Sequence, residues 1–160
     1  WPKGADCKSA VSDFGILYLF AEGKNEWAMY NVELKRPCKI NDIYPDNIEY
    51  CTDIACKEPF FRPDEDFFDC EELVQYKVAS SDIDVSQHMN NVEYVRVALG
   101  ALSCEKLEKI HITDIDIAYL AQCYEGELLS IRLRKNKNIY ELGIIKQNKK
   151  TACIIQIIGK

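Results

Sequence analysis

In the second half of the chain, the spacing of apolar and polar positions changes where a short alternating run meets a longer stretch with helical spacing. Residues 73–78 alternate as a strand does, whereas apolar residues recur every three or four positions along the next stretch. This spacing predicts a helix over residues 91–107, with Asn90 as its N-cap and Glu93 completing a capping box. Alternation then resumes and predicts strands over residues 109–124, 128–134, 139–146 and 151–158.

The predicted helix carries one apolar stripe, formed by Val92, Val95, Leu99 and Leu102 and widened by Tyr94, Ala98 and Ala101. We expect the stripe to face the core, and we expect Met89 and Tyr94 to form a hydrophobic staple at the start of the helix. One long helix among strands joined by short turns is typical of an α+β fold, in which the helix packs on one face of an antiparallel sheet.

The first seventy residues follow a less regular pattern. Two apolar runs, residues 9–20 and 26–34, flank a polar turn at residues 22–25 and predict an antiparallel hairpin. Periodicity then fades over residues 43–70, where three prolines break any long element, so we expect a linker that crosses a surface. The residues expected to anchor this linker to a core are Phe60, Phe61, Phe67 and Phe68.

Composition and charge limit the classes of protein to which this chain can belong. The chain has 160 residues, 48% of them apolar and 29% charged, which suits one globular domain or one domain with a partial second. A net charge of −6 argues against a general nucleic-acid binder. Apolar runs are far shorter than a membrane span and no signal-peptide pattern opens the chain, so we expect no membrane partner. The chain begins at Trp1 without Met, so we expect it to be incomplete.

Two basic clusters interrupt this acidic background: Arg132, Arg134, Lys135 and Lys137 form the first, and Lys146, Lys149 and Lys150 form the second. They are interpreted either as solvated hairpin ends or as a docking patch for an acidic partner, and the first cluster is the one where we expect such docking. The eight cysteines include no C-x-x-C pair, and neither His88 nor His111 has zinc-finger spacing, so no metal site is predicted. We expect reduced thiols in a cytosolic protein.

Residues 81–91 combine acid, amide, hydroxyl and imidazole groups where the strand meets the helix, and a helix N-terminus presents free N–H groups. Within this stretch, D-I-D-V-S-Q-H-M-N-N-V-E-Y at residues 82–94 resembles the signature of the acyl-acyl-carrier-protein thioesterases, which have the hot-dog fold. Residues 117–127, I-A-Y-L-A-Q-C-Y-E-G-E, are similar to the family's strand that carries a catalytic acid beside a cysteine. The order of W-P-K-G at residue 1, D-F at 13, a strand around Trp27 and K-R-P at 35 resembles the later strands of the family's first repeat.

The resemblance implies an α+β hot-dog fold, an antiparallel sheet wrapped around one long helix, with two repeats in tandem. Residues 1–45 would then be a partial first repeat made of strands, residues 46–72 a linker, and residues 73–160 a complete repeat with the active site. It also implies a cytoplasmic enzyme of fatty acid metabolism that needs no cofactor and releases free fatty acid from acyl carrier protein. A homodimer is a further expectation, because hot-dog sheets commonly pair.

In the implied site, Asp84 acts as general base or nucleophile and His88 orients the substrate or transfers a proton. The N–H groups at Asn90 and Asn91 would hold the developing oxyanion. Taken alone, Asp84 is more typical of a turn acid that bonds its own backbone, and the catalytic role rests on His88 four residues on and on the resemblance. Cys123 is either a thiolate nucleophile or a buried, inert side chain.

Two positions depart from the family pattern. Ser86 stands where the family has Asn, and Gln122 stands where it has a catalytic Glu, which a glutamine cannot replace as a base. Asp84 would then be the remaining carboxylate, unless Glu125 or Glu127 turns inward. The alternatives are therefore a degenerate acyl-binding protein and an acyl-CoA thioesterase.

Overall fold

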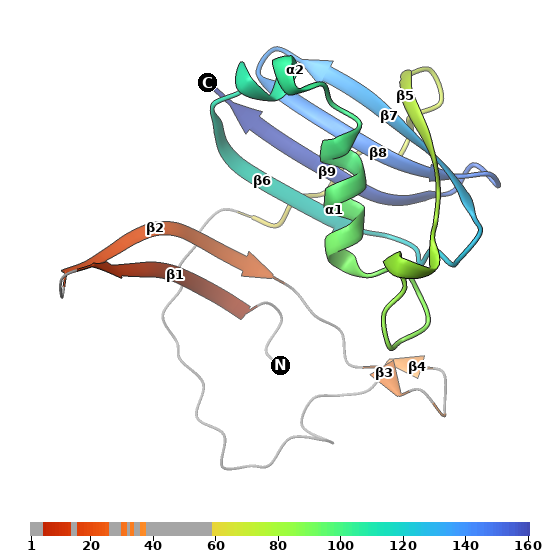
Figure 1. The fold of residues 1–160 in the computed structure, drawn as a ribbon, viewed down its shortest axis with the longest axis horizontal. Coiled ribbons are helices and arrows are strands. Elements are labelled where there is room, and N and C mark those ends of the chain that lie inside the picture. The colour runs from red at the N-terminus through yellow and green to blue at the C-terminus, as the bar shows by residue number, and fades with distance from the viewer. Residues whose placement is uncertain (1–4, 14–15, 26–29, 32, 34–35, 38–58) are drawn as a thin grey trace. The chain divides into compact units, whose positions relative to one another are not determined.

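The computed structural model describes residues 5–13, 16–25, 30–31, 33, 36–37 and 59–160 (Figure 1). The chain divides into two units, Trp1–Pro59 and Phe60–Lys160, with the boundary inside the expected linker. None of the helices among the described residues has the length and apolar content needed to cross a membrane.

The alternating segments of the second unit pair into one antiparallel sheet, in the order β5-β7-β8-β9-β6. Its strands are β5 (Glu71–Lys77), β6 (Ile112–Tyr119), β7 (Leu128–Asn136), β8 (Ile139–Lys146) and β9 (Thr151–Gly159). The strands predicted from alternation are confirmed, although β6 is shorter than predicted. It ends at Tyr119 because the next two amides, of Leu120 and Ala121, both donate to the Ala152 carbonyl, at 2.8 and 3.0 Å.

Two helices stand where one was predicted. Helix α1 (Asn91–Gly100) packs on one face of the sheet, and α2 (Cys104–Glu108) follows it (Figure 1). The prediction of one continuous helix is wrong because Gly100 is a weak helix former and Ser103 begins a new helix. The Ser103 hydroxyl accepts a hydrogen bond from the Lys106 amide at 3.3 Å, which is an N-cap interaction.

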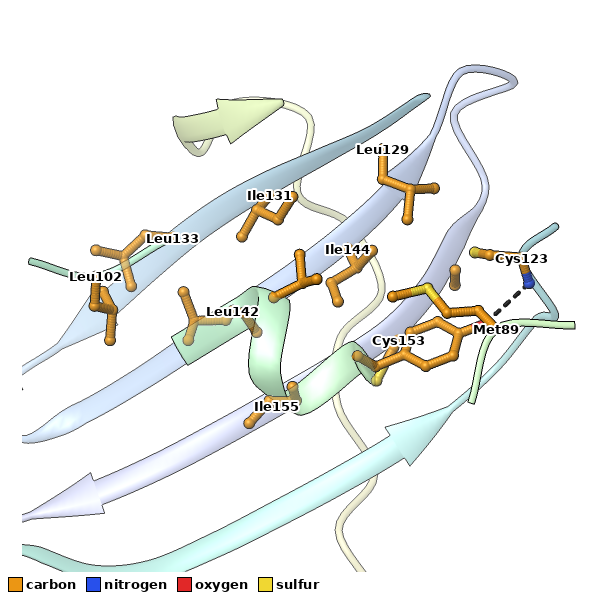
Figure 2. Close-up of a cluster of buried hydrophobic side chains, with 14 of the residues drawn as sticks. Met89, Leu102, Cys123, Leu129, Ile131, Leu133, Leu142, Ile144, Cys153 and Ile155 are labelled. Atoms are coloured by element: carbon orange, nitrogen blue, oxygen red, sulfur yellow. Dashed lines mark hydrogen bonds between the residues drawn. The ribbon is translucent and has the colours of Figure 1, made fainter. Parts of the chain in front are cut away.

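The core lies between α1 and the sheet. Figure 2 shows side chains of β7, β8 and β9 gathered there, and the fully buried ones include Leu129, Ile131, Leu142, Ile144 and Ile155. Burying one such side chain contributes about 1.5–3 kcal/mol. From the helical segment, the buried side chains are Tyr94, Val97, Ala98 and Leu102. The predicted stripe is therefore wrong at Val92, which is 69% exposed, and it missed Val97.

The other face of the sheet is covered by residues 64–68, which we call the strap. Phe67 is buried against Gly143 of β8, where an added Cβ would lie 2.7 Å from the ring, so only glycine fits there. The Arg134 guanidinium lies 4.4 Å from the ring centroid and donates to the carbonyls of Asp66 and Asp64 at 2.9 Å each. Of the four phenylalanines expected as anchors, Phe67 is buried, Phe61 is half-buried, and Phe60 and Phe68 are exposed.

In the first unit, β1 (Ala5–Asp13) pairs with β2 (Ile16–Asn25), and β3 (Tyr30–Asn31) pairs with β4 (Arg36–Pro37). A hairpin is present, but its predicted turn at residues 22–25 is wrong, since these residues lie in β2 opposite the start of β1. The apolar run at residues 9–20, which was predicted as one strand, contains Asp13 and Gly15, two residues of turn-forming types. Residues 1–4, 26–29 and 38–58, with Trp27 and most of the linker, lie outside the described residues, so the partial first repeat stays a prediction.

Candidate active site

A tight turn brings the two catalytic candidates of the junction face to face. Ile83 and Met89 form an isolated antiparallel bridge, and inside it the Asp84 amide donates to the His88 carbonyl at 3.1 Å. The Gln87 amide closes the turn by donating to the Asp84 carbonyl at 3.0 Å, with Gln87 itself at a φ of 64°. The four-residue spacing of Asp84 and His88 therefore corresponds to two facing positions of a small hairpin.

Ser86 connects these two side chains. Its hydroxyl donates to Asp84 Oδ1 and lies 2.9 Å from His88 Nε2. His88 Nδ1 lies 3.2 Å from the Met89 carbonyl, which only accepts, so Nδ1 carries a proton. Since the single hydroxyl proton of Ser86 points to Asp84, a protonated Nε2 donates to the Ser86 oxygen, and an unprotonated Nε2 accepts the Ser86 proton only when Asp84 releases it. The departure from the family's Asn thus produces a continuous carboxylate–hydroxyl–imidazole chain.

The same contacts set the charge of Asp84. The hydrogen bonds from the Ser86 hydroxyl and amide lower the pKa of Asp84 below its usual value. Burial opposes them, and the charge of His88 adds the smallest lowering effect. The amide contact, at 2.8 Å, is the local turn interaction that was one of the two sequence interpretations. The local turn interpretation is therefore confirmed, the catalytic role of Asp84 stays a prediction, and the carboxylate is ionised at neutral pH.

The buried residue Asp82 anchors this loop, a role that the sequence interpretation did not assign to it. It lies at the end of a 3₁₀ turn (Ser80–Asp82), is 2% exposed, and accepts hydrogen bonds from Tyr76 Oη at 2.7 Å and the Ala79 amide at 2.8 Å. Arg96 of α1 adds an ion pair at 3.2 Å. Burial alone would raise the pKa of Asp82, but these three partners lower it. Two acids two residues apart give no sequence signal of which one is buried.

The start of α1 uses most of its amides internally. Asn90 Oδ1 accepts from the Val92 amide at 2.9 Å, so the predicted N-cap is confirmed. The capping box is wrong, because the Asn90 amide already donates to the Asp82 carbonyl at 2.8 Å and Glu93 pairs with Arg96. The Asn90 N–H is therefore occupied, whereas the Asn91 N–H has no partner within the described part of the chain.

The Gln122–Cys123 segment is fastened to the same turn. The Met89 amide donates to the Cys123 carbonyl at 2.8 Å, and the Cys123 amide donates to Tyr94 Oη at 2.9 Å, the dashed line in Figure 2. The Cys123 side chain is fully buried, and burial raises the pKa of its thiol. Both observations favour the inert interpretation of Cys123 over the nucleophile.

A cavity of about 230 Å³ opens beside the turn. The turn, the start of α1 and the segment after β6 all contribute residues to its lining. The described lining residues are His88, Met89, Asn91, Tyr94, Tyr119, Leu120, Ala121 and Gln122. Asp84 and Ser86 reach it through His88, and Cys123 is not among the described lining residues. A larger cavity, of about 360 Å³, lies under the strap beside Phe67 and Arg132 and contains none of the predicted site residues.

Neither nearby glutamate replaces the missing acid. The Glu127 carboxylate accepts from the Tyr124 amide at 3.1 Å and pairs with Lys146 at 2.9 Å. Glu125 is exposed, and neither residue is in the described lining of the cavity.

The described residues include no cluster of His, Cys, Asp and Glu that could hold a metal ion. The thiols of Cys70, Cys104, Cys123 and Cys153 are free.

Comparison with known proteins identifies the domain. Residues 68–158, more than half of the chain, match the family model of the acyl-ACP thioesterase C-terminal domain. A crystal structure of an acyl-ACP thioesterase from Bacteroides thetaiotaomicron superposes with a TM-score of 0.68 at 22% identity, over 100% of this chain and 64% of that one. A protein from Lactobacillus plantarum assigned as an oleoyl thioesterase gives 0.69 at 20% identity, over 98% and 62%. No curated protein sequence matched.

These likenesses confirm the hot-dog fold that the sequence resemblance implied. The chain spans slightly less than two thirds of the length of either solved structure.

Proposed function

Since this chain belongs to the acyl-ACP thioesterase family, whose C-terminal domain its residues 68–158 match, we propose that it hydrolyses the thioester of acylated carrier protein to free fatty acid and carrier. The observation that carries the proposal is the Ser86 hydroxyl in contact with both Asp84 and His88, beside a cavity with an open helix amide. Thioester hydrolysis needs an activated water, a site for the oxyanion and a proton for the leaving thiolate, and this arrangement offers all three.

The first step is attack on the carbonyl carbon. In this proposal the thioester carbonyl lies at the edge of the cavity beside His88, where the attacking water also reaches Asp84. The Asp84 carboxylate takes a proton from this water as the water oxygen bonds to the carbonyl carbon, and the carbonyl oxygen gains the negative charge. The Asn91 N–H, at the positive end of α1, is the main-chain donor open to that oxygen. Asp84 has an alternative role as a nucleophile, in which its oxygen forms an anhydride that water later cleaves.

The second step breaks the carbon–sulfur bond. The proton gained by Asp84 passes to the Ser86 oxygen while the Ser86 proton passes to His88 Nε2, and the imidazolium protonates the leaving thiolate. The proton removed from water is thereby delivered to sulfur, and all three side chains return to their starting states. Ser86 acts in this scheme as a proton relay, a role that an asparagine amide does not offer.

Carrier docking is proposed at the turn between β8 and β9, which holds Lys149 and Lys150. Arg132 and Arg134 of the other cluster are occupied with strap carbonyls and with Glu72 and Glu141. The β7–β8 turn also lies at the opposite end of β8, an eight-residue strand about 27 Å long. The β8–β9 turn shares its end of the sheet with Tyr119, which lines the cavity.

Two alternatives remain in competition. An acyl-CoA thioesterase would use the same chemistry with a different thiol. A degenerate acyl-binding protein is favoured by one observation, the glutamine at position 122 with no carboxylate in the described lining of the cavity.

The test is release of free thiol from matched acyl-carrier and acyl-CoA substrates, with purified protein that includes any upstream sequence. We expect turnover of both, with the higher kcat/KM for the carrier. Higher kcat/KM for acyl-CoA would favour the acyl-CoA thioesterase. Binding of the acylated carrier without release would favour the degenerate acyl-binding protein, and neither binding nor release would overturn the proposal.

A further inference from the structure

Gln122 is held more firmly than a side chain on an exposed loop requires. The backbone carbonyls of Ala121 and Gln122 both accept hydrogen bonds. The Ala121 carbonyl accepts from Tyr94 Oη at 3.3 Å, and the Gln122 carbonyl accepts from Lys146 Nζ at 2.8 Å. Lys146 is only 13% exposed and is fixed by Glu127. The Cys123 amide and carbonyl are bonded as well, so the backbone is held on both sides of Gln122.

The side-chain amide is oriented too. Tyr124 Oη donates to Gln122 Oε1 at 2.9 Å, which uses the acceptor end of the amide. The two N–H groups on Nε2 have no partner within the described part of the chain. Because Gln122 lines the cavity together with His88 and Asn91, the chain presents a neutral donor there with its acceptor end already occupied.

We propose that the Gln122 amide donates a hydrogen bond to the carbonyl oxygen of the bound thioester and strengthens it as that oxygen becomes negative. This inference rests on the proposed function and assigns Gln122 a part in it. The donor would act with the Asn91 N–H, so that one main-chain group and one side chain share the charge. Tyr124 and Lys146 are positioning residues, because they hold the amide and do not meet the substrate.

The proposal and a degenerate site predict opposite effects of Gln122→Glu on activity. If position 122 needs a base, Gln122→Glu restores activity. If it supplies a donor, Gln122→Glu replaces that donor with an anion beside a developing oxyanion, and activity falls at neutral pH.

The experiment measures kcat and KM of thiol release between pH 4.5 and 8.5 for the wild type, Gln122→Glu, Gln122→Leu and Tyr124→Phe. We expect a 10–100-fold loss of kcat for Gln122→Leu, with KM changed less than threefold. Gln122→Glu should lose more at pH 8 than at pH 5, where a protonated carboxyl can donate, and Tyr124→Phe should lose less than Gln122→Leu. Asn136→Asp, an exposed position at the end of β7 and far from the proposed docking turn, is the matched control for the charge change.

A kcat for Gln122→Glu at or above the wild-type value at pH 8 would overturn the proposal. Binding separates this failure from failure of the proposed function. We would compare a ketone analogue, in which CH₂ replaces the sulfur, with a thioether analogue, in which CH₂ replaces the carbonyl, both on carrier protein. A wild-type preference for the ketone that Gln122→Leu abolishes supports the donor even in a protein without turnover. Equal affinities in the wild type, or a preference that Gln122→Leu retains, contradict it.

Discussion

The Asp82 carboxylate accepts a hydrogen bond from the Tyr76 hydroxyl at 2.7 Å, which joins the end of β5 to the loop that carries the candidate site. The Asp82 carbonyl accepts from the Asn90 amide at 2.8 Å, so the same residue also fixes the start of α1. Asp82 thus fixes both ends of the segment that contains the Asp84–Ser86–His88 turn, one at β5 and the other at α1. Its geometry depends on a residue that has no contact with the cavity.

Replacing Asp82 with Asn should lower the free energy of unfolding by about 1–3 kcal/mol at pH 7, since the Arg96 ion pair is lost and a buried donor is left poorly matched. The pKa of Asp82 in the folded protein lies below its ordinary 3.8, so its ionic contribution is present at neutral pH and is lost as the pH falls below about 3.8. Urea unfolding at pH 7 and pH 3 measures this. We expect the difference between wild type and variant to shrink at pH 3. A difference that is the same at both values would contradict the assignment.

The contact between Phe67 and Gly143 gives a prediction about the strap. Gly143→Ala places a methyl group 2.7 Å from the ring and should cost about 1–3 kcal/mol in thermal or urea unfolding. Gly100→Ala is the matched control, because nothing lies within 4 Å of its added Cβ, and it should be neutral or slightly stabilising. Phe67→Leu should recover part of the loss when combined with Gly143→Ala. Strictly additive losses would show that the ring and the methyl group do not meet.

The docking proposal separates the two basic clusters. Lys149→Glu with Lys150→Glu should raise KM for an acylated carrier about tenfold and leave KM for a short acyl-pantetheine unchanged, because only the carrier brings an acidic surface. Lys135→Glu with Lys137→Glu makes the same charge change at the other end of β8 and should have little effect. Equal effects of the two pairs would mean that net charge, and not a docking site, controls the affinity.

Sequence reasoning succeeded where one local cause decides the structure. Alternation predicted all five strands of the sheet because successive side chains of a strand point to opposite faces, and Asn90 was identified as an N-cap because capping needs only its immediate neighbours. It failed where distant residues decide. The strap depends on Arg134 and Gly143, about seventy residues away in sequence, and the first hairpin was misplaced because one apolar run covers two strands.

The candidate site divides in the same way. The motif located Asp84, His88 and Asn91, and the resemblance located Gln122. Neither indicated that Ser86 would touch both Asp84 and His88, since that contact follows from the turn at Gln87. The role of Asp82 also needed the tertiary structure, because its partners come from β5 and α1.

The central claim is that Asp84 and Ser86 act as one unit, and a double-mutant cycle on kcat tests it most directly. Thiol release from an acylated carrier would be measured for the wild type, Asp84→Asn, Ser86→Ala and the double variant, with folding checked by circular dichroism. We predict that each single change lowers kcat about 100-fold and that the double variant is no slower than the worse single variant, because either change breaks the same relay. A double variant slowed by the product of the two single effects, or a Ser86→Ala variant with wild-type kcat, would contradict the account.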